Sequence, residues 1–329
     1  RLARLAKCRI YHAEVEGLQL AEQRVDVAGR PPVYFDLLSI NTGSTPAISN
    51  IIGADRYAIA AKPIDRFLLQ WEQLQDRVLA AAGEFPISVI GGGAGGVELA
   101  LAMQYRLAQL LGEQSDNQDR AKVAIRLITK SETILPSYST SVRKRFYTIL
   151  RQRGIEVIEG LGVSKIEADS LCLDDQTEFS SLANILVTNA AAPNWPKNSG
   201  LAVDEAGFIQ VNRQLQSLSH ENVFAAGDIA SLLEQRQKSG VYAVRQGRVL
   251  SQNLRRFALQ KSLKKYHAQK TALSLIGTGD QTAVASRGLW TVEGAWVWRL
   301  KHWIDQRFVQ QYSDLQAMQP DEAPSFNSK

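Results

Sequence analysis

Three glycines at fixed spacing form the clearest chemical motif in the chain. Gly91, Gly93 and Gly96 follow directly on the apolar run 87–90 and precede a long run of helix-forming residues. Gly91 permits a tight turn, Gly93 lets a diphosphate approach the backbone, and Gly96 lets a helix and a strand pack closely. The helix N-terminus then presents free N–H groups and its positive dipole end to the phosphates. We therefore expect a dinucleotide-binding turn here, rather than a glycine-rich turn without a ligand.

The end of the following strand would select the nicotinamide cofactor. An acid at this position binds the ribose 2′-hydroxyl of NAD. The expected strand 121–130 ends in Thr129 and Lys130, without an acid. Lys130 either meets the 2′-phosphate of NADPH or is simply solvated. The choice between NADH and NADPH stays open.

Alternating strands and helices must position these motifs. Strands are expected at 87–90, 121–130 and 154–160, with helices between them, and this order predicts an α/β fold with a parallel doubly wound sheet. Further strands are expected at 8–14, 24–28, 34–40, 162–167, 169–173, 183–193 and 223–228, and helices over 63–82, 95–111, 140–153, 240–257 and 295–312.

The composition narrows the class of protein. A net charge of +5, 45% hydrophobic and 22% charged residues are ordinary for a globular protein, and no basic run is dense enough for nucleic acid. No stretch approaches the roughly 20 apolar residues that span a bilayer. Cys8 and Cys172 lie far apart and the four histidines are scattered, so we expect neither a disulfide framework nor a metal site. Because the first residue is Arg1 and not Met, we expect a fragment of a longer protein. Two lone cysteines fit a reducing compartment, so we expect a cytoplasmic protein.

Several motifs together resemble one known family. GGGAGGVELA (91–100), NTGS (41–44) and NVFAAGD (222–228) resemble the flavoprotein pyridine-nucleotide oxidoreductases, most closely the type II NADH dehydrogenase branch. VYAVRQG (241–247) and LSLIGTGDQTAVASRG (273–288) resemble the FAD-containing subgroup found fused to, or beside, selenide, water dikinase. The resemblance covers nearly the whole chain. It implies two Rossmann-like, three-layer FAD/NAD(P)-binding domains, with FAD and NADH or NADPH as cofactors.

The resemblance also implies the order of the domains. The family's flavin domain begins with its own strand, glycine turn and helix, and none precedes residue 8 here. We therefore expect an incomplete FAD-binding domain, and poor FAD binding by this chain alone. The implied division is a first FAD-binding part (1–80), an NAD(P)H-binding domain (81–192), a second FAD-binding part (193–257), a small C-terminal α+β region (258–318) and a linker (319–329).

Residues at two strand ends would contact the flavin if the resemblance holds. Asn41, Thr42 and Gly43 match the segment where the chain passes the flavin. Gly227 and Asp228 match the pair that contacts the ribityl chain and the pyrophosphate, and a strand-end Asp is a good acceptor for ribityl hydroxyls. Asp228 could equally cap the following helix.

Four further residues match positions near the reacting atoms or the domain crossover. Thr188, followed by Asn189, stands where the family tends to have a Thr-Gly turn. Gln246 and Gly247 match a segment beside the flavin ring near the acceptor, or form an ordinary helical turn. Glu98 matches an acid near the nicotinamide, or is a first-turn glutamate favoured by the helix dipole.

The absence of a close cysteine pair implies that reduced flavin passes its electrons directly to a quinone or another small acceptor. Two alternatives stay open, a non-catalytic module and a selenium-reducing accessory of a selenophosphate-synthesising partner. On a helix over 295–312, a stripe of Trp, Leu, Ile, Phe and Tyr is flanked by Arg299, Lys301, His302 and Arg307. This pattern predicts peripheral contact with the cytoplasmic membrane face, or a helix packed on the flavin domain.

Overall fold

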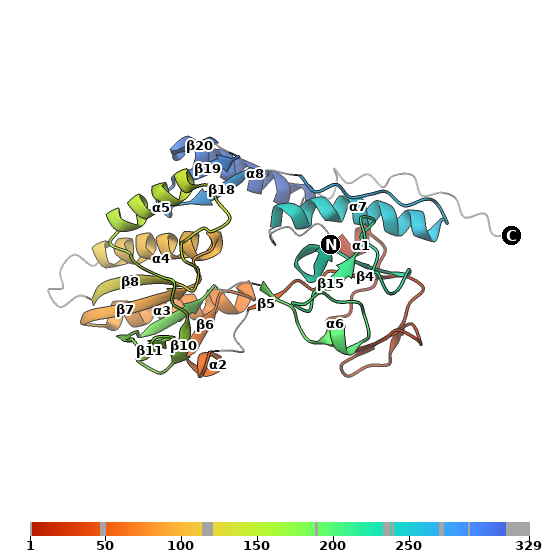
Figure 1. Ribbon diagram of the computed structural model, residues 1–329, viewed down its shortest axis with the longest axis horizontal. Coiled ribbons are helices and arrows are strands. Elements are labelled where there is room, and N and C mark those ends of the chain that lie inside the picture. The colour runs from red at the N-terminus through yellow and green to blue at the C-terminus, as the bar shows by residue number, and fades with distance from the viewer. Residues whose placement is uncertain are drawn as a thin grey trace.

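The computed structural model describes residues 2–46, 51–113, 121–187, 190–232, 238, 240–269, 273–288 and 290–313. It has two lobes side by side, with a smaller C-terminal module lying across the top of the view in Figure 1. We call residues 51–187 the nucleotide lobe, residues 2–46 with 190–269 the second lobe, and residues 273–313 the C-terminal module. The chain therefore contributes to the second lobe both before and after it forms the nucleotide lobe.

A five-stranded parallel sheet forms the centre of the nucleotide lobe. In spatial order it contains β6 (Ala58–Ala60), β13 (Ala183–Leu186), β7 (Gly83–Ile90), β8 (Ala121–Thr129) and β9 (Glu156–Glu159). All neighbouring pairs are parallel. This confirms the parallel α/β sheet predicted from the sequence.

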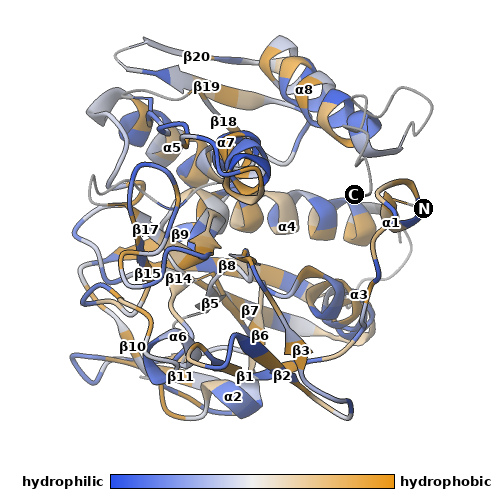
Figure 2. Cartoon of the chain, turned by 90° about the vertical axis from the view of Figure 1, so that its right-hand side faces the viewer, coloured by the Kyte–Doolittle hydropathy of each residue, from blue (hydrophilic) through white to orange (hydrophobic). Residues whose placement is uncertain are grey.

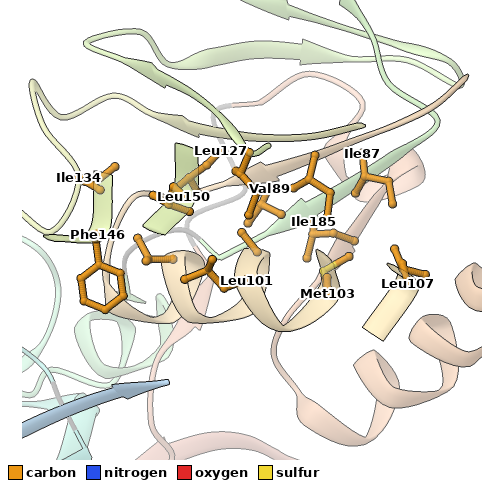
Figure 3. Packing of buried hydrophobic residues seen from close by; sticks show 14 of the residues in the cluster. Ile87, Val89, Leu101, Met103, Leu107, Leu127, Ile134, Phe146, Leu150 and Ile185 are labelled. Atoms are coloured by element: carbon orange, nitrogen blue, oxygen red, sulfur yellow. The ribbon is translucent and has the colours of Figure 1, made fainter. Parts of the chain in front are cut away.

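Both faces of this sheet are covered. Val89 and Leu127 point to the helical face, where they pack with Leu101 (Figure 3). Ile90 and Ile128, one residue further along the same strands, pack on the opposite face against an antiparallel sheet. Successive side chains of a strand alternate between faces, so a strand buried on both faces is apolar throughout. The covering elements are helices α3 (Ile64–Ala80), α4 (Ala94–Glu113) and α5 (Thr140–Gln152) on one side, and strands β10 (Val163–Ile166), β11 (Ser170–Leu173) and β12 (Glu178–Ser180) on the other.

Short parallel strand pairs build the second lobe. Strand β4 (Leu38–Ile40) pairs with β16 (Val223–Ala225), and β15 (Ile209–Val211) pairs with β17 (Ala230–Leu232). Helix α7 (Gly240–Ala258) packs along β16, where the Phe257 ring meets Phe224 edge-on with 5.7 Å between centroids. The other elements of this lobe are the antiparallel strands β1 (Val15–Gln19), β2 (Arg24–Val27) and β3 (Val33–Tyr34) and the short helices α1 (Leu2–Leu5) and α6 (Trp195–Asn198).

Most expected elements are confirmed, and three expected strands are not. The strand expected over 34–40 is split, since β3 ends at Tyr34 and β4 begins at Leu38. The helices expected over 63–82, 140–153, 240–257 and 295–312 are present, with ends within two residues of the prediction. Residues 8–14 form no strand. All seven residues are exposed, so the segment has no buried apolar face that would hold it in a sheet. Residues 183–193 do not form one strand, since β13 ends at Leu186.

The crossover between the lobes explains part of this difference. Strand β14 (Ala190–Ala191) pairs antiparallel with β5 (Thr45–Pro46), so the two chain crossings are paired with each other instead of extending β13. Residues 58–80, expected with the first FAD-binding part, contribute β6 and α3 to the nucleotide lobe, and the short helix α2 (Ala54–Tyr57) precedes them. Thr188, Asn189 and the expected linker 319–329 lie outside the described residues.

The C-terminal module docks on helices α4 and α5, at the same end of the molecule in both views (Figures 1 and 2). It contains β18 (Ser274–Gly277), β19 (Ala283–Arg287), β20 (Trp290–Gly294) and helix α8 (Ala295–Ser313). Arg153, which ends α5, forms an ion pair with Asp280. A Cβ on Gly279 would lie 2.5 Å from the carbonyl oxygen of Leu101, so the backbone of the module touches α4 directly.

The Asp280 contact makes docking of the module sensitive to acid. Burial alone raises the pKa of Asp280, but hydrogen bonds from Thr278 and Thr282 and the charge of Arg153 outweigh it, so the pKa lies below its ordinary value. The stabilisation is therefore complete above the unfolded-state pKa of about 3.9 and is lost as the pH falls through the lower folded value. We predict that Asp280→Asn lowers the free energy of unfolding by about 1–2 kcal/mol at neutral pH.

Chemical unfolding of both proteins between neutral pH and about pH 3 measures this effect. Asp76→Asn, at an exposed position of α3, is the matched control. The acid-dependent loss of stability should shrink in Asp280→Asn and stay unchanged in the control. Equal acid sensitivity of all three proteins would contradict the assignment.

Candidate functional site

The glycine turn has the geometry that a diphosphate site requires. Gly91 follows the end of β7 with φ +131° and donates its N–H to the carbonyl of Ile128 at 2.8 Å. A Cβ on Gly96 would lie 1.8 Å from the carbonyl oxygen of Gly91, so no other residue fits there without moving the backbone. A Cβ on Gly93 would meet nothing within 4 Å. The turn is therefore tight against the sheet and open at Gly93.

Neighbouring residues hold this turn against the end of β8. Gly92 lies so close to Thr129 that a Cβ on it would be 2.6 Å from the Thr129 Cβ. The carbonyl of Gly92 accepts the N–H of Leu135 at 2.8 Å, which ties the turn to the loop that follows β8. Helix α4 begins at Ala94, and the first N–H groups of a helix have no partner within the helix. These groups are thus available beside the open position at Gly93.

Lys130 stands at the end of β8, as expected from the sequence. Its side chain is 84% exposed, and its Nζ lies 3.9 Å from the Asp174 carboxylate. Such exposed pairs contribute about 0–1 kcal/mol, so Lys130 is held only loosely.

A second turn gathers three of the predicted flavin-side residues. Gly227 follows β16 with φ +75° and donates its N–H to Gln246 Oε1 at 2.7 Å. The Gln246 side chain, from α7, is only 6% exposed. Asn41 follows the neighbouring strand β4, and a Cβ on Gly227 would lie 2.5 Å from its Oδ1. The structure therefore brings Asn41, Gly227 and Gln246 together, while Thr42 and Gly247 are exposed beside them.

Asp228 connects this turn to the crossover. Its Oδ2 lies 3.5 Å from the Ser44 hydroxyl and 3.5 Å from Lys62 Nζ. Ser44 follows Gly43, which has φ +75°, and Lys62 follows β6 of the nucleotide lobe. Asp228 lies inside the short 3₁₀ helix Gly227–Ile229, whose N-cap residue is Ala226.

Glu98 lies further along α4 and contacts the C-terminal module. Its Oε1 accepts the N–H of Gly277 at 3.0 Å and lies 3.6 Å from Lys301 Nζ on α8. Burial alone lowers the pKa of Lys301, but the carboxylates of Glu98 and Asp305 outweigh it, so the pKa lies above the ordinary lysine value. Sequence reasoning gave Lys301 only a flanking role, because no local pattern indicates a partner about 200 residues earlier in the chain.

The aromatic stripe on α8 faces solvent. Val297 is the buried residue of this helix, and the helix packs against β18, β19 and β20. Trp296, Trp303, Ile304, Phe308 and Tyr312 are all exposed.

The described residues contain no helix that is long and apolar enough to cross a membrane. They also contain no group of three His, Cys, Asp or Glu side chains placed to hold a metal ion. Cys8 and Cys172 are both free and belong to different lobes.

Comparison with known proteins identifies the family. The pyridine nucleotide-disulphide oxidoreductase family matches residues 6–247, which is most of the chain. The chain belongs to this family. Pyridine nucleotide-disulphide oxidoreductases of this kind depend on FAD and NAD(P)H, which confirms the enzyme class and the two cofactors expected from the sequence.

Similar curated proteins belong to the same family. Demethylphylloquinone reductase NdbB of Synechocystis is 27% identical over 69% of this chain and 54% of its own length. Human ferroptosis suppressor protein 1 is 28% identical, over 66% and 56%. Type II NADH:quinone oxidoreductase Ndh of Mycobacterium tuberculosis is 24% identical, over 68% and 53%. The chain thus spans about half the length of these relatives.

A solved structure supports the fold. The sulfide:quinone oxidoreductase of Aquifex aeolicus superposes with a TM-score of 0.76 at 17% identity, covering 92% of this chain and 75% of that one. At this identity the similarity concerns the fold alone. It confirms the predicted α/β class of FAD/NAD(P)-binding oxidoreductases.

The contact between Gln246 and Gly227 should stabilise the second turn measurably. Gln246→Leu removes the acceptor of a buried N–H, which costs about 1–3 kcal/mol of unfolding free energy. Gln246→Glu keeps an acceptor oxygen and should lose less. Arg248→Ala, at an exposed position of the same helix, is the control.

Urea unfolding of the four proteins measures the difference. The expected order of stability is wild type and Arg248→Ala, then Gln246→Glu, then Gln246→Leu. A Gln246→Leu variant within about 0.5 kcal/mol of wild type would show that the contact does not hold the turn.

Proposed function

We propose that the protein is an NAD(P)H dehydrogenase that transfers hydride from NAD(P)H to FAD and then electrons to a quinone or another small acceptor. The carrying observation is a pair of turns, at Gly91–Gly96 and at Gly227–Asp228, each at the carboxyl ends of parallel strands. Nucleotides bind at such edges of open α/β sheets. The names of two relatives, demethylphylloquinone reductase and type II NADH:quinone oxidoreductase, support a quinone as acceptor.

The nucleotide lobe would hold NAD(P)H through its backbone. The turn fits a diphosphate because Gly93 leaves space and Gly96 brings the start of α4 close to the sheet. Gly91, Gly93 and Gly96 would therefore bind the diphosphate, and Lys130 lies where the adenosine ribose would come. We retain 81–192 as the NAD(P)H-binding domain, with β6 and α3 added to it.

The second lobe would hold FAD between two strand ends. Asp228 fits a ribityl hydroxyl, since its carboxylate is a half-buried acceptor held near Ser44 and Lys62. Gln246 would position Gly227, because its side-chain oxygen is already bonded to the Gly227 N–H. The remaining described residues that we propose to line this site are Asn41, Thr42, Gly43 and Gly247.

Bound FAD would supply the redox chemistry by accepting the hydride and releasing the electron pair to the acceptor. The protein's own residues would orient the cofactors and manage protons. Reduction of a quinone to a quinol takes two electrons and two protons. Lys301 would carry one of these protons at Nζ, because Glu98 and Asp305 favour its protonated form. Glu98 would hold Lys301 beside the α4 end of the nucleotide site.

Membrane contact through residues 295–312 is part of the proposal. The exposed aromatic side chains of α8 alternate with Arg299, His302 and Arg307, a composition suited to a membrane interface. Lys301 differs from these cations because it is bonded to Glu98. The alternative function, an accessory module of a selenide, water dikinase, is supported only by the resemblance of residues 241–247 and 273–288.

The proposal predicts that Lys301 matters only to acceptors that need protons. In FAD-loaded protein, Lys301→Met should slow NAD(P)H-driven reduction of a soluble quinone by about a hundredfold. Reduction of ferricyanide, which takes electrons without protons, should be unchanged. Activity should fall as the pH rises through the Lys301 pKa, and Glu98→Gln should move this alkaline limb to lower pH because it removes the carboxylate that raises that pKa.

Steady-state kinetics with both acceptors tests the function and the role of Lys301. Asp76→Asn, at an exposed position of α3 away from the module, is the control. Equal loss with quinone and ferricyanide would mean that Lys301 only holds the module in place. Wild-type protein that binds FAD but reduces neither acceptor would overturn the proposed dehydrogenase.

A further inference from the structure

We infer that the nucleotide site prefers NADPH to NADH, with Lys130 binding the 2′-phosphate. This inference rests on the proposed function, because it concerns the same nucleotide site. The sequence alone left the choice of cofactor open. The structure shows which side chains at this edge of the sheet are already buried or hydrogen-bonded and which are exposed.

Thr129 is not available to a ribose hydroxyl. It is the last residue of β8 and is 6% exposed. Its side chain packs against Gly92, and its Oγ1 accepts the N–H of Ser131 at 3.3 Å. A ribose acceptor usually comes from this strand end. Here the exposed side chain at the strand end is that of Lys130.

The acid at the neighbouring strand end is already engaged. Glu159 is the register partner of Thr129 in the pairing of β8 with β9. Its Oε1 accepts the N–H of Ile134 at 2.6 Å and the hydroxyl of Tyr147. Burial and the Glu159 carboxylate together raise the pKa of Tyr147, as expected for a phenol that stays protonated and donates to a carboxylate. Glu159 thus holds the loop that follows β8.

The loop fixes the place of Lys130 without fixing its side chain. The Gly160 N–H donates to the Ser131 carbonyl at 3.0 Å, and the Leu135 N–H donates to the Gly92 carbonyl at 2.8 Å. These bonds hold the backbone that follows Lys130 to the end of β9 and to the glycine turn. The ammonium group is free to meet a phosphate, since its pairing with Asp174 is at 3.9 Å and exposed.

Two acidic residues flank Lys130 and set the limits of the inference. Asp174 also accepts the N–H of Gly162 at 3.2 Å, so its carboxylate is already engaged. Glu132 is exposed, two residues beyond Lys130. It is the described carboxylate of this loop that could accept a ribose 2′-hydroxyl and so favour NADH. A test of the inference must therefore separate Lys130 from Glu132.

Calorimetric titration with ADP-ribose and 2′-phospho-ADP-ribose provides this test, because both probes carry the diphosphate and differ only in the 2′-phosphate. We expect 2′-phospho-ADP-ribose to bind about ten- to a hundredfold more tightly, the effect of one charge-assisted hydrogen bond. Lys130→Ala should abolish the preference, and Lys130→Glu should reverse it. Lys122→Ala, at an exposed position near the start of β8, should leave the preference unchanged.

The outcomes distinguish this inference from the proposed function. If both probes bind equally well, the NADPH preference is wrong while the diphosphate site stands. If ADP-ribose binds more tightly and Glu132→Ala removes that difference, Glu132 is the ribose acceptor and the site favours NADH. If neither probe binds, the nucleotide site itself is refuted, and the preference with it.

Discussion

The close approach of Gly96 to Gly91 is the constraint on which the site depends. A Cβ at Gly96 would lie 1.8 Å from the Gly91 carbonyl oxygen, so helix α4 can start this near the sheet only with glycine at that position. The contact places the first turn of α4 at the carboxyl ends of the parallel strands. The same helix then carries Glu98 to the C-terminal module, so the glycine contact also determines where that module docks.

The two lobes use one physical arrangement with different means of support. In the nucleotide lobe the turn is held by backbone packing on Thr129 and by the Leu135 hydrogen bond. In the second lobe the turn at Gly227 is held by the buried side chain of Gln246. Lys62, from the nucleotide lobe, reaches Asp228 of the second lobe across the paired crossover strands. The chemistry that we propose depends on these lobes presenting their turns to each other.

The strongest local patterns were enough to predict most of the fold. The apolar run before Gly91 and the glycine spacing predicted β7, the turn and α4. Both features are visible in a few adjacent residues, because a strand buried on both faces is apolar throughout and a close backbone contact requires glycine. The exposed segment 8–14 was predicted wrongly, since alternation of residue types cannot reveal whether a neighbouring strand exists. The short crossover strands β5 and β14 were missed because their pairing joins residues about 145 positions apart.

The candidate site residues at strand ends were predictable from the sequence. Contacts between residues far apart in the sequence were not. Asn41, Gly227 and Gln246 were each expected near the flavin from the family resemblance, and the structure brings Asn41 and Gln246 to Gly227. The pairing of Glu98 with Lys301 and the engagement of Glu159 by Tyr147 follow only from tertiary packing. Our proposals of a proton carrier and of a cofactor preference rest on these contacts.

Backbone amide NMR of the labelled protein during titration with 5′-ADP tests the central claim most directly, because it observes the atoms proposed to hold the diphosphate. The account predicts that the largest saturable shifts fall on the amides from Gly93 to Val97, with those of Gly227 and its neighbours little changed. Saturable shifts elsewhere, with the amides of this turn unmoved, would contradict it.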